Sequence, residues 1–149
     1  HQCHMPKMKG ADGKSFSTHG VVKPIERVKE SCVACHKDST PAKAKWQIES
    51  IRNYTKGKMR KAEYWLGQLI DTYAVAARAG VAPSLLDQAR AKHEEAHVLW
   101  EYWTAENSDG FHNPTLARET LTGSIAASKA GVKILNDALA TMPKGGSQK

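Results

Sequence analysis

The sequence lacks any long hydrophobic run, and β-branched residues seldom follow one another. No stretch approaches the roughly 18 apolar residues that a membrane-spanning helix needs. Ala, Lys, Glu and Gln are frequent instead, and these residues favour helices over sheets. We therefore expect a mainly α-helical chain without a membrane span, and its 149 residues are enough for one domain of ordinary size.

Acidic residues are in the minority, with 15 Asp and Glu against 22 Lys and Arg, for a formal net charge of +7. Such a balance can suit nucleic acid, a membrane surface or a small anion. The basic residues are scattered among acidic neighbours, however, and there is neither an arginine-rich reading helix nor a row of aromatic residues to stack on bases. We therefore expect no nucleic-acid partner.

Cysteine is scarce too, because Cys3, Cys32 and Cys35 are the only three, and an odd number argues against a plain disulfide framework. Two of them form the motif Cys32-Val33-Ala34-Cys35-His36. This C-x-x-C-H spacing lets two thiols add to the vinyl groups of one haem while the next imidazole binds the iron. A zinc site needs four ligands, and a thioredoxin-like site needs a βαβ context. The motif therefore predicts covalently attached haem c.

The first four residues, His1-Gln2-Cys3-His4, read as the end of a second C-x-x-C-H motif. No initiator Met and no signal peptide precede them. We expect Cys3 to carry a second haem and the chain to be the C-terminal part of a longer protein.

Two histidines lie in loops from which an imidazole could bind a haem iron. His19 follows a glycine-punctuated stretch, and His112 lies in a turn that leads into a helix. A second axial histidine gives a low-spin haem that transfers electrons. The other interpretation is an exposed loop histidine, and the residues alone leave both open for each position.

The segment His93-Glu94-Glu95-Ala96-His97 matches the H-E-x-x-H motif of zinc peptidases. No third zinc ligand is evident, and charge-rich helices match this short motif by chance. We expect instead that His97 packs near Trp100 and that His93 is solvated.

The positions of glycine and proline divide the chain into three regions. Residues 1–39 are irregular and interrupted by Gly and Pro, so they are expected to bind haem. Residues 40–142 are expected to form long helices that also provide a dimer-forming surface, and residues 143–149 a flexible tail.

The helix signals within 40–142 are local. Caps and prolines predict helices from Pro41 to near Gly80, from Pro83 to about Glu106 and from Pro114 to Met142. Gly57 marks an expected bend or break in the first. Apolar faces are expected at Trp46, Ile48, Ile51, Tyr54, Ala62, Trp65, Leu66, Leu69, Ile70 and Tyr73 in the first helix, at Leu85, Ala89, Ala96, Leu99, Trp100 and Trp103 in the second, and at Leu121, Ile125, Ser128, Val132, Leu135 and Leu139 in the third.

Four elements in order carry a family resemblance: Cys3-His4-Met5-Pro6-Lys7, Thr18-His19, Cys32 to His36, and Gly110-Phe111-His112-Asn113-Pro114. Together they resemble the C-terminal part of the cytochrome c nitrite reductases, periplasmic pentahaem enzymes that reduce nitrite to ammonium. The resemblance covers essentially the whole chain.

The resemblance implies a role for each histidine of these elements. His4 is then the proximal ligand of the fourth haem, attached through Cys3, and His36 that of the fifth, attached through Cys32 and Cys35. His112 is the distal ligand of the fourth haem, and His19 that of the second, whose attachment motif lies upstream.

Several functional elements of this family are missing from the chain, and they limit the role that the resemblance implies for it. The lysine-ligated C-x-x-C-K haem, the catalytic Arg, Tyr and His, and a calcium site lie N-terminal to the matching region of the family. The resemblance therefore implies relay haems and a homodimer surface here, with electrons from a membrane quinol-oxidising cytochrome or a soluble cytochrome. Alternatives are an octahaem nitrite reductase or hydroxylamine oxidoreductase relative, and a non-catalytic multihaem electron carrier.

Overall fold

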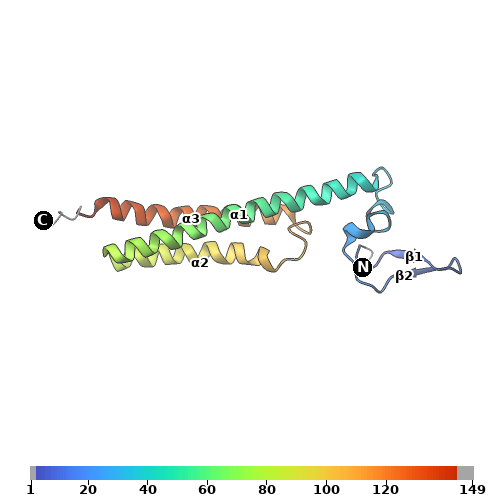
Figure 1. Cartoon of the computed structure of the whole chain (residues 1–149), viewed down its shortest axis with the longest axis horizontal. Helices are drawn as coiled ribbons and strands as arrows, with labels where there is room; N and C mark the ends of the chain where they lie inside the picture. Colours follow the sequence, from blue (N-terminus) through green and yellow to red (C-terminus); the bar gives the residue numbers. More distant parts are fainter. Residues whose placement is uncertain (1–2, 144–149) are drawn as a thin grey trace. The chain divides into compact units, whose positions relative to one another are not determined.

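The computed structural model describes residues 3–143 of the chain, which divides into two units, His1–Ile51 and Arg52–Lys149. The expected mainly α fold, an irregular segment followed by three long helices, is confirmed (Figure 1). Among the described residues, no helix combines the length and apolar character that a membrane crossing demands. The expected tail falls almost entirely outside the described residues, as do His1 and Gln2.

The first unit contains a small antiparallel hairpin that the sequence did not predict. Strand β1 (Lys7–Lys9) pairs with β2 (Ser15–Ser17), with Met8 opposite Phe16. The loop between the strands closes because the Gly10 N–H donates to the Lys14 carbonyl at 2.9 Å and Gly13 adopts a φ of +76°. Strands of three residues are too short to show the alternation from which strands are predicted.

A 3-10 helix, η1 (Pro24–Arg27), and a single π-helical turn, η2 (Lys29–Val33), follow the hairpin. Their apolar side chains join the first turns of α1 in one small cluster. Its buried members are Val28, Ala44 and Ile48, and Ile25, Cys32 and Val33 pack against them. The segment that carries the haem motif therefore has only a modest core of its own.

Helix α1 (Pro41–Ala79) begins and ends as the local signals predict. The Thr40 hydroxyl accepts a hydrogen bond from the Lys43 N–H at 3.2 Å, which caps the first turn. At the other end Gly80 has a φ of +82°, and the Val81 N–H donates to the Ala76 carbonyl at 3.1 Å in a Schellman motif. Of the bend or break expected at Gly57, the break was wrong, because the helix continues through that residue, and the bend stays a prediction.

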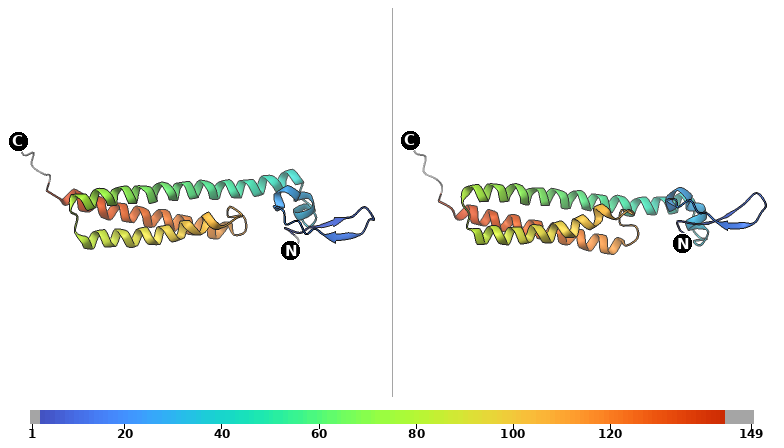
Figure 2. Two further views of the ribbon diagram at one scale, coloured as in Figure 1. Left: turned by 60° about the horizontal axis from the view of Figure 1, so that its bottom comes forward. Right: turned by 90° about the horizontal axis from the view of Figure 1, so that it is seen from below.

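In the second unit, α1 from Arg52 onward packs with α2 (Pro83–Ala105) and α3 (Pro114–Thr141) in a three-helix bundle (Figure 2). Each layer of the core takes a side chain from every helix. Ala62, Trp103 and Leu121 share one layer, and Leu66, Ala96 and Ala127 share the next. Small residues let the helices approach closely: a Cβ added to Gly131 would lie 2.8 Å from Leu69 Cδ1.

Two hydrogen bonds between helices satisfy polar groups inside this bundle. The buried Ser124 hydroxyl donates to the Ala96 carbonyl at 2.7 Å, and the Trp103 indole donates to the Thr120 hydroxyl at 2.7 Å. Both join α2 to α3, so they fix the register of these two helices as well as their contact.

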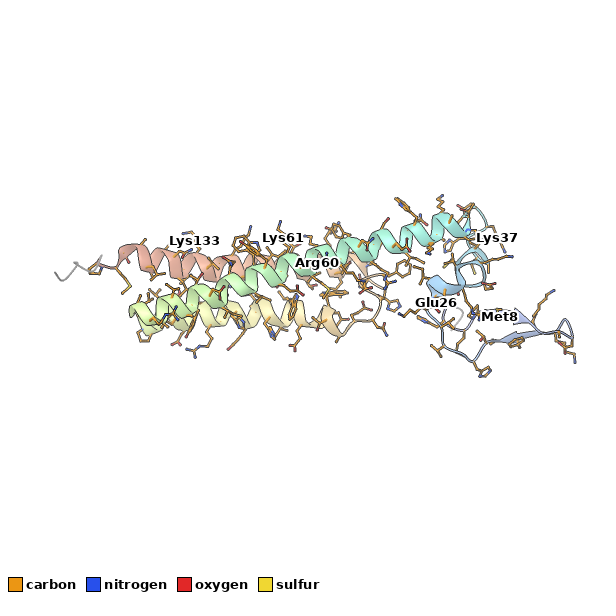
Figure 3. All side chains as sticks on the ribbon, viewed as in Figure 1. Met8, Glu26, Lys37, Arg60, Lys61 and Lys133 are labelled. Carbon is orange, nitrogen blue, oxygen red and sulfur yellow. The ribbon has the colours of Figure 1, made fainter. Side chains whose placement is uncertain are left out.

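The predicted apolar faces are partly corrected. In α3 the whole predicted seam is buried or half-buried, and so is the predicted face of α2. In α1 three members of the predicted face are exposed instead: Trp46 to 67%, Tyr54 to 51% and Ile70 to 54%. Charged side chains, including the labelled Arg60, Lys61 and Lys133, project from the outside of the bundle (Figure 3).

Candidate haem-binding site

The C-x-x-C-H motif forms one tight turn at the end of η2. The Cys32 carbonyl accepts hydrogen bonds from the Cys35 N–H at 3.1 Å and from the His36 N–H at 2.9 Å. The Ser39 N–H donates to the His36 carbonyl at 3.0 Å, which continues the turn toward α1. The backbone thus holds two thiols and one imidazole within a single helical turn, which is the spacing that haem attachment requires.

Burial and charge around this turn fit a haem that attaches from the outside. Cys35 and His36 are exposed, Cys32 is half-buried, and none of the three cysteines forms a disulfide within the described structure. Burial raises the pKa of the Cys32 thiol and the nearby Cys3 thiol raises it further, so Cys32 stays protonated at neutral pH. The buried Ser31 hydroxyl beside it has no hydrogen-bond partner in the described structure. The residues present therefore fit a covalently bound haem c.

The other predicted site residues of this unit lie around the hairpin. Cys3 and His4 are exposed, and His4 Nδ1 lies 3.2 Å from the Val22 carbonyl oxygen. The Val22 N–H approaches the His4 carbonyl at 3.5 Å, so the two chain segments run side by side. His19 is exposed just after β2. The ligand roles of His4 and His19 stay predictions.

His112, in the second unit, belongs to a loop folded around one carboxylate. Glu106 Oε1 accepts from the Ser108 N–H at 3.0 Å and lies 3.2 Å from His112 Nδ1. Glu106 Oε2 accepts from the Ser108 hydroxyl at 2.9 Å and from the Gly110 N–H at 3.0 Å. The imidazole itself is exposed, so the loop orients His112 without covering it.

Electrostatics keep this carboxylate ionised. Burial alone raises the pKa of Glu106, but the hydrogen bonds from Gly110, Ser108 and His112 outweigh burial, and the pKa lies below its ordinary value. A carboxylate only accepts hydrogen bonds, so the 3.2 Å contact fits His112 Nδ1 as the donor. With Nδ1 facing the carboxylate, coordination of a metal by this histidine would use Nε2.

One turn of α1 clamps the same loop through Asp109. Arg52 Nε donates to Asp109 Oδ2 at 2.7 Å, and Lys56 Nζ lies 3.2 Å from the same oxygen. Burial alone raises the pKa of Asp109, but the hydrogen bonds and charges of Arg52 and Lys56 lower it overall. Asp109 and Gly110 both take left-handed conformations, with φ of 54° and 83°.

Gly110 is required here for space as well as for conformation. A Cβ at this position would overlap the Thr55 hydroxyl oxygen and lie 3.1 Å from the Ala117 Cβ. The loop backbone therefore sits directly on α1 and α3, in contact with a buried Thr55 whose hydroxyl has no partner in the described structure. Only a residue without a Cβ allows the loop to approach the two helices this closely.

The zinc interpretation of H-E-x-x-H finds no support among residues 3–143, where no three His, Cys, Asp or Glu side chains gather to hold a metal. His93 and His97 stack with ring centroids 5.6 Å apart, and His97 lies 5.8 Å from Trp100. The predicted packing of His97 near Trp100 is confirmed. His93 is half-buried, so the prediction that it is solvated was only partly right.

The helical fold and the thiol–thiol–imidazole turn define a c-type cytochrome. The family comparison is more specific: the chain belongs to the cytochrome c552 family, which matches residues 1–147. The predicted resemblance to cytochrome c nitrite reductase is thereby confirmed.

Relatives of known identity are longer than this chain. The cytochrome c nitrite reductase subunit NrfA of Nitratidesulfovibrio vulgaris Hildenborough is 30% identical over 91% of the chain, which spans 27% of that protein. Cytochrome c-552 of Haemophilus influenzae Rd is 25% identical over 83% of the chain and 23% of its own length. The solved cytochrome c nitrite reductase of Desulfovibrio desulfuricans ATCC 27774, described for its two calcium sites, superposes with a TM-score of 0.84 at 27% identity. That match covers 92% of this chain and 30% of the solved one.

Sequence reasoning found the thiols and the histidines but missed the residues that orient His112. Glu106 was expected only as the end of a helix, and the segment around His112 only as a turn that leads into the next helix. The local spacing of Glu106, Ser108 and Gly110 is a weak signal of a loop folded around a carboxylate. The clamp from Arg52 has no local signal, because 57 positions separate Arg52 from Asp109.

Proposed function

We propose that this chain is the relay-haem part of a periplasmic cytochrome c that reduces nitrite to ammonium with six electrons. The observation that carries the proposal is the Cys32–Cys35–His36 turn within a chain that belongs to the cytochrome c552 family. The similarity to the nitrite reductases of Nitratidesulfovibrio vulgaris and Desulfovibrio desulfuricans supports nitrite as the substrate. Haem c supplies one-electron redox chemistry when it is bound.

Each predicted site residue has a role in this proposal. Cys32 and Cys35 hold one haem by thioether bonds, with His36 as its proximal ligand. Cys3 holds a second haem, with His4 as its ligand. His19 and His112 supply axial imidazoles to haems of the intact protein. The nitrite-binding iron and the calcium site belong to the intact protein outside this chain.

The helices are proposed to form the homodimer surface. Large apolar side chains stand exposed on the outside of the bundle, among them Tyr64 at 59% and Val75 at 48% on α1, and Val98 at 65% and Tyr102 at 58% on α2. Val98 and Tyr102 lie about one turn apart on α2, and Tyr64 and Val75 about three turns apart on α1, so each pair lies on one helix face, as suits helix–helix association. Electrons would come from a membrane quinol-oxidising cytochrome or a soluble cytochrome.

The whole proposal is tested on the intact, haem-loaded protein. We expect ammonium to form from nitrite with a reduced dye as donor, and the haem-iron count to match the number of haem motifs in the full sequence. An intact protein that has neither an open nor a lysine-ligated haem, and forms no ammonium, would instead be the non-catalytic electron carrier. A count of eight motifs would indicate the octahaem relatives.

The ligand role of His112 has its own test. In His112→Ala, one haem should change from low-spin six-coordinate to high-spin, because no imidazole replaces the lost ligand. Electron paramagnetic resonance of the oxidised protein measures this change. His97→Ala, which removes an imidazole on α2, is the matched control and should leave every haem low-spin.

A further inference from the structure

Glu106 lies at the C-terminal cap of α2 and gathers four donors on its two carboxylate oxygens. Its own N–H donates to the Tyr102 carbonyl at 3.2 Å, so the residue is tied to the last turn of the helix. The side chain is only 14% exposed. Its partners, given above, are the Ser108 N–H, the Ser108 hydroxyl, the Gly110 N–H and His112 Nδ1.

The Ser108 hydroxyl links Glu106 to the backbone of His112. Its hydroxyl donates to Glu106 Oε2 at 2.9 Å and accepts from the His112 N–H at 3.0 Å. His112 is therefore held at two points: Ser108 binds its backbone N–H, and Glu106 contacts its ring nitrogen Nδ1. Ordering this exposed ring costs rotamer freedom, which the contact with Glu106 has to offset.

We propose that Glu106 is a positioning residue: it accepts the Nδ1–H of His112, directs Nε2 to a haem iron and lowers the reduction potential of that haem. The inference rests on the proposed function, since it requires His112 to be an axial ligand. A carboxylate on the second nitrogen of a metal-bound histidine fixes the tautomer and raises the basicity of the ligand nitrogen. The stronger donor and the added negative charge both favour ferric iron over ferrous iron.

The decisive variant is Glu106→Gln in the intact, haem-loaded protein. Glutamine keeps the shape of the side chain but removes the charge and replaces one acceptor oxygen with an NH₂ donor. We expect the haem content and the low-spin spectrum to persist while the potential of one haem rises, with about a tenfold shift of its redox equilibrium, or ~59 mV. Glu106→Asp retains the charge and should shift the potential less.

Glu101→Gln is the matched control, because Glu101 lies on the same helix, 3.7 Å from His97 Nδ1, with its side chain 63% exposed. It should leave all potentials unchanged. An unchanged potential in Glu106→Gln, together with high-spin haem in His112→Ala, would overturn the positioning role and leave the ligand assignment intact. Low-spin haem throughout in His112→Ala would overturn both.

Ser108→Ala is a second test of the same inference, for use if the Glu106→Gln protein is not obtained with all of its haems. It removes one donor from the carboxylate without removing its charge, so the carboxylate becomes a stronger acceptor for His112. The potential of the same haem should then fall, in the direction opposite to Glu106→Gln. An unchanged or raised potential would count against the inference.

Discussion

The segment of residues 3–51 and the bundle of residues 52–143 differ in how much apolar surface they bury. The first buries few apolar side chains, namely Pro6, Val28, Ala44 and Ile48, and exposes Cys35 and His36. The second has a layered core in which Leu69, Leu121 and Leu135 are 1% exposed or less. A short segment cannot bury enough apolar surface by itself, whereas three long helices can. We therefore expect haem to supply the apolar bulk that the first region lacks, and the packing of the three helices to persist without it.

The largest effect should come from Cys35→Ser, which removes one of the two thiols that hold a haem. We expect the haem-to-protein ratio to fall by the equivalent of one haem, while the far-ultraviolet circular dichroism of the helices is retained. Intact mass and a haem-iron assay measure the first, and thermal melting measures the second. An unchanged haem ratio would disprove the attachment site, and loss of the helices would show that the bundle also depends on haem.

The next largest effect is expected on the stability of the bundle, and two adjacent residues of α1 allow it to be compared with a control. Leu69 is 1% exposed and Ile70 is 54% exposed. Leu69→Ala leaves a cavity among the three helices and should lower the free energy of unfolding by about 2–5 kcal/mol. Ile70→Ala should change it by no more than about 0.5 kcal/mol. Urea denaturation followed at the helical signal compares the two, and equal effects would contradict the packing described here.

The smallest effect concerns the loop clamp and its dependence on pH. The pKa of Asp109 is lowered by Arg52 and Lys56, so its contribution is present above the ordinary pKa of about 4 and is lost as pH falls through the lower, folded value. Asp109→Asn should cost about 1 kcal/mol at neutral pH and flatten the acid limb of the stability profile.

Asp137→Asn is the control for the clamp, because the Asp137 and Lys133 side chains form an ion pair that is 63% and 74% exposed. It should alter neither the stability nor its pH profile measurably. If both variants behaved alike in denaturation between pH 3 and 7, the clamp would have no special role.

Much of the fold could be predicted because its signals are local. Thr40, Gly80 and Asn113 act within a few residues, and the structure places a cap or a helix end at each. The exposed Trp46, Tyr54 and Ile70 could not be predicted, since helical spacing says which residues share a face but not how much of it a neighbouring helix covers. The hairpin of β1 and β2 was missed because three-residue strands have no period to detect.

By itself, the sequence determined that two thiols and an imidazole lie within one turn and that three helices follow, because spacing, caps and turn residues act between near neighbours in the chain. Only the tertiary structure decided which nitrogen of His112 is held by Glu106 and how Arg52 secures the loop through Asp109. Those contacts depend on how a helix end folds back and on residues distant in sequence meeting in space, which no local pattern specifies.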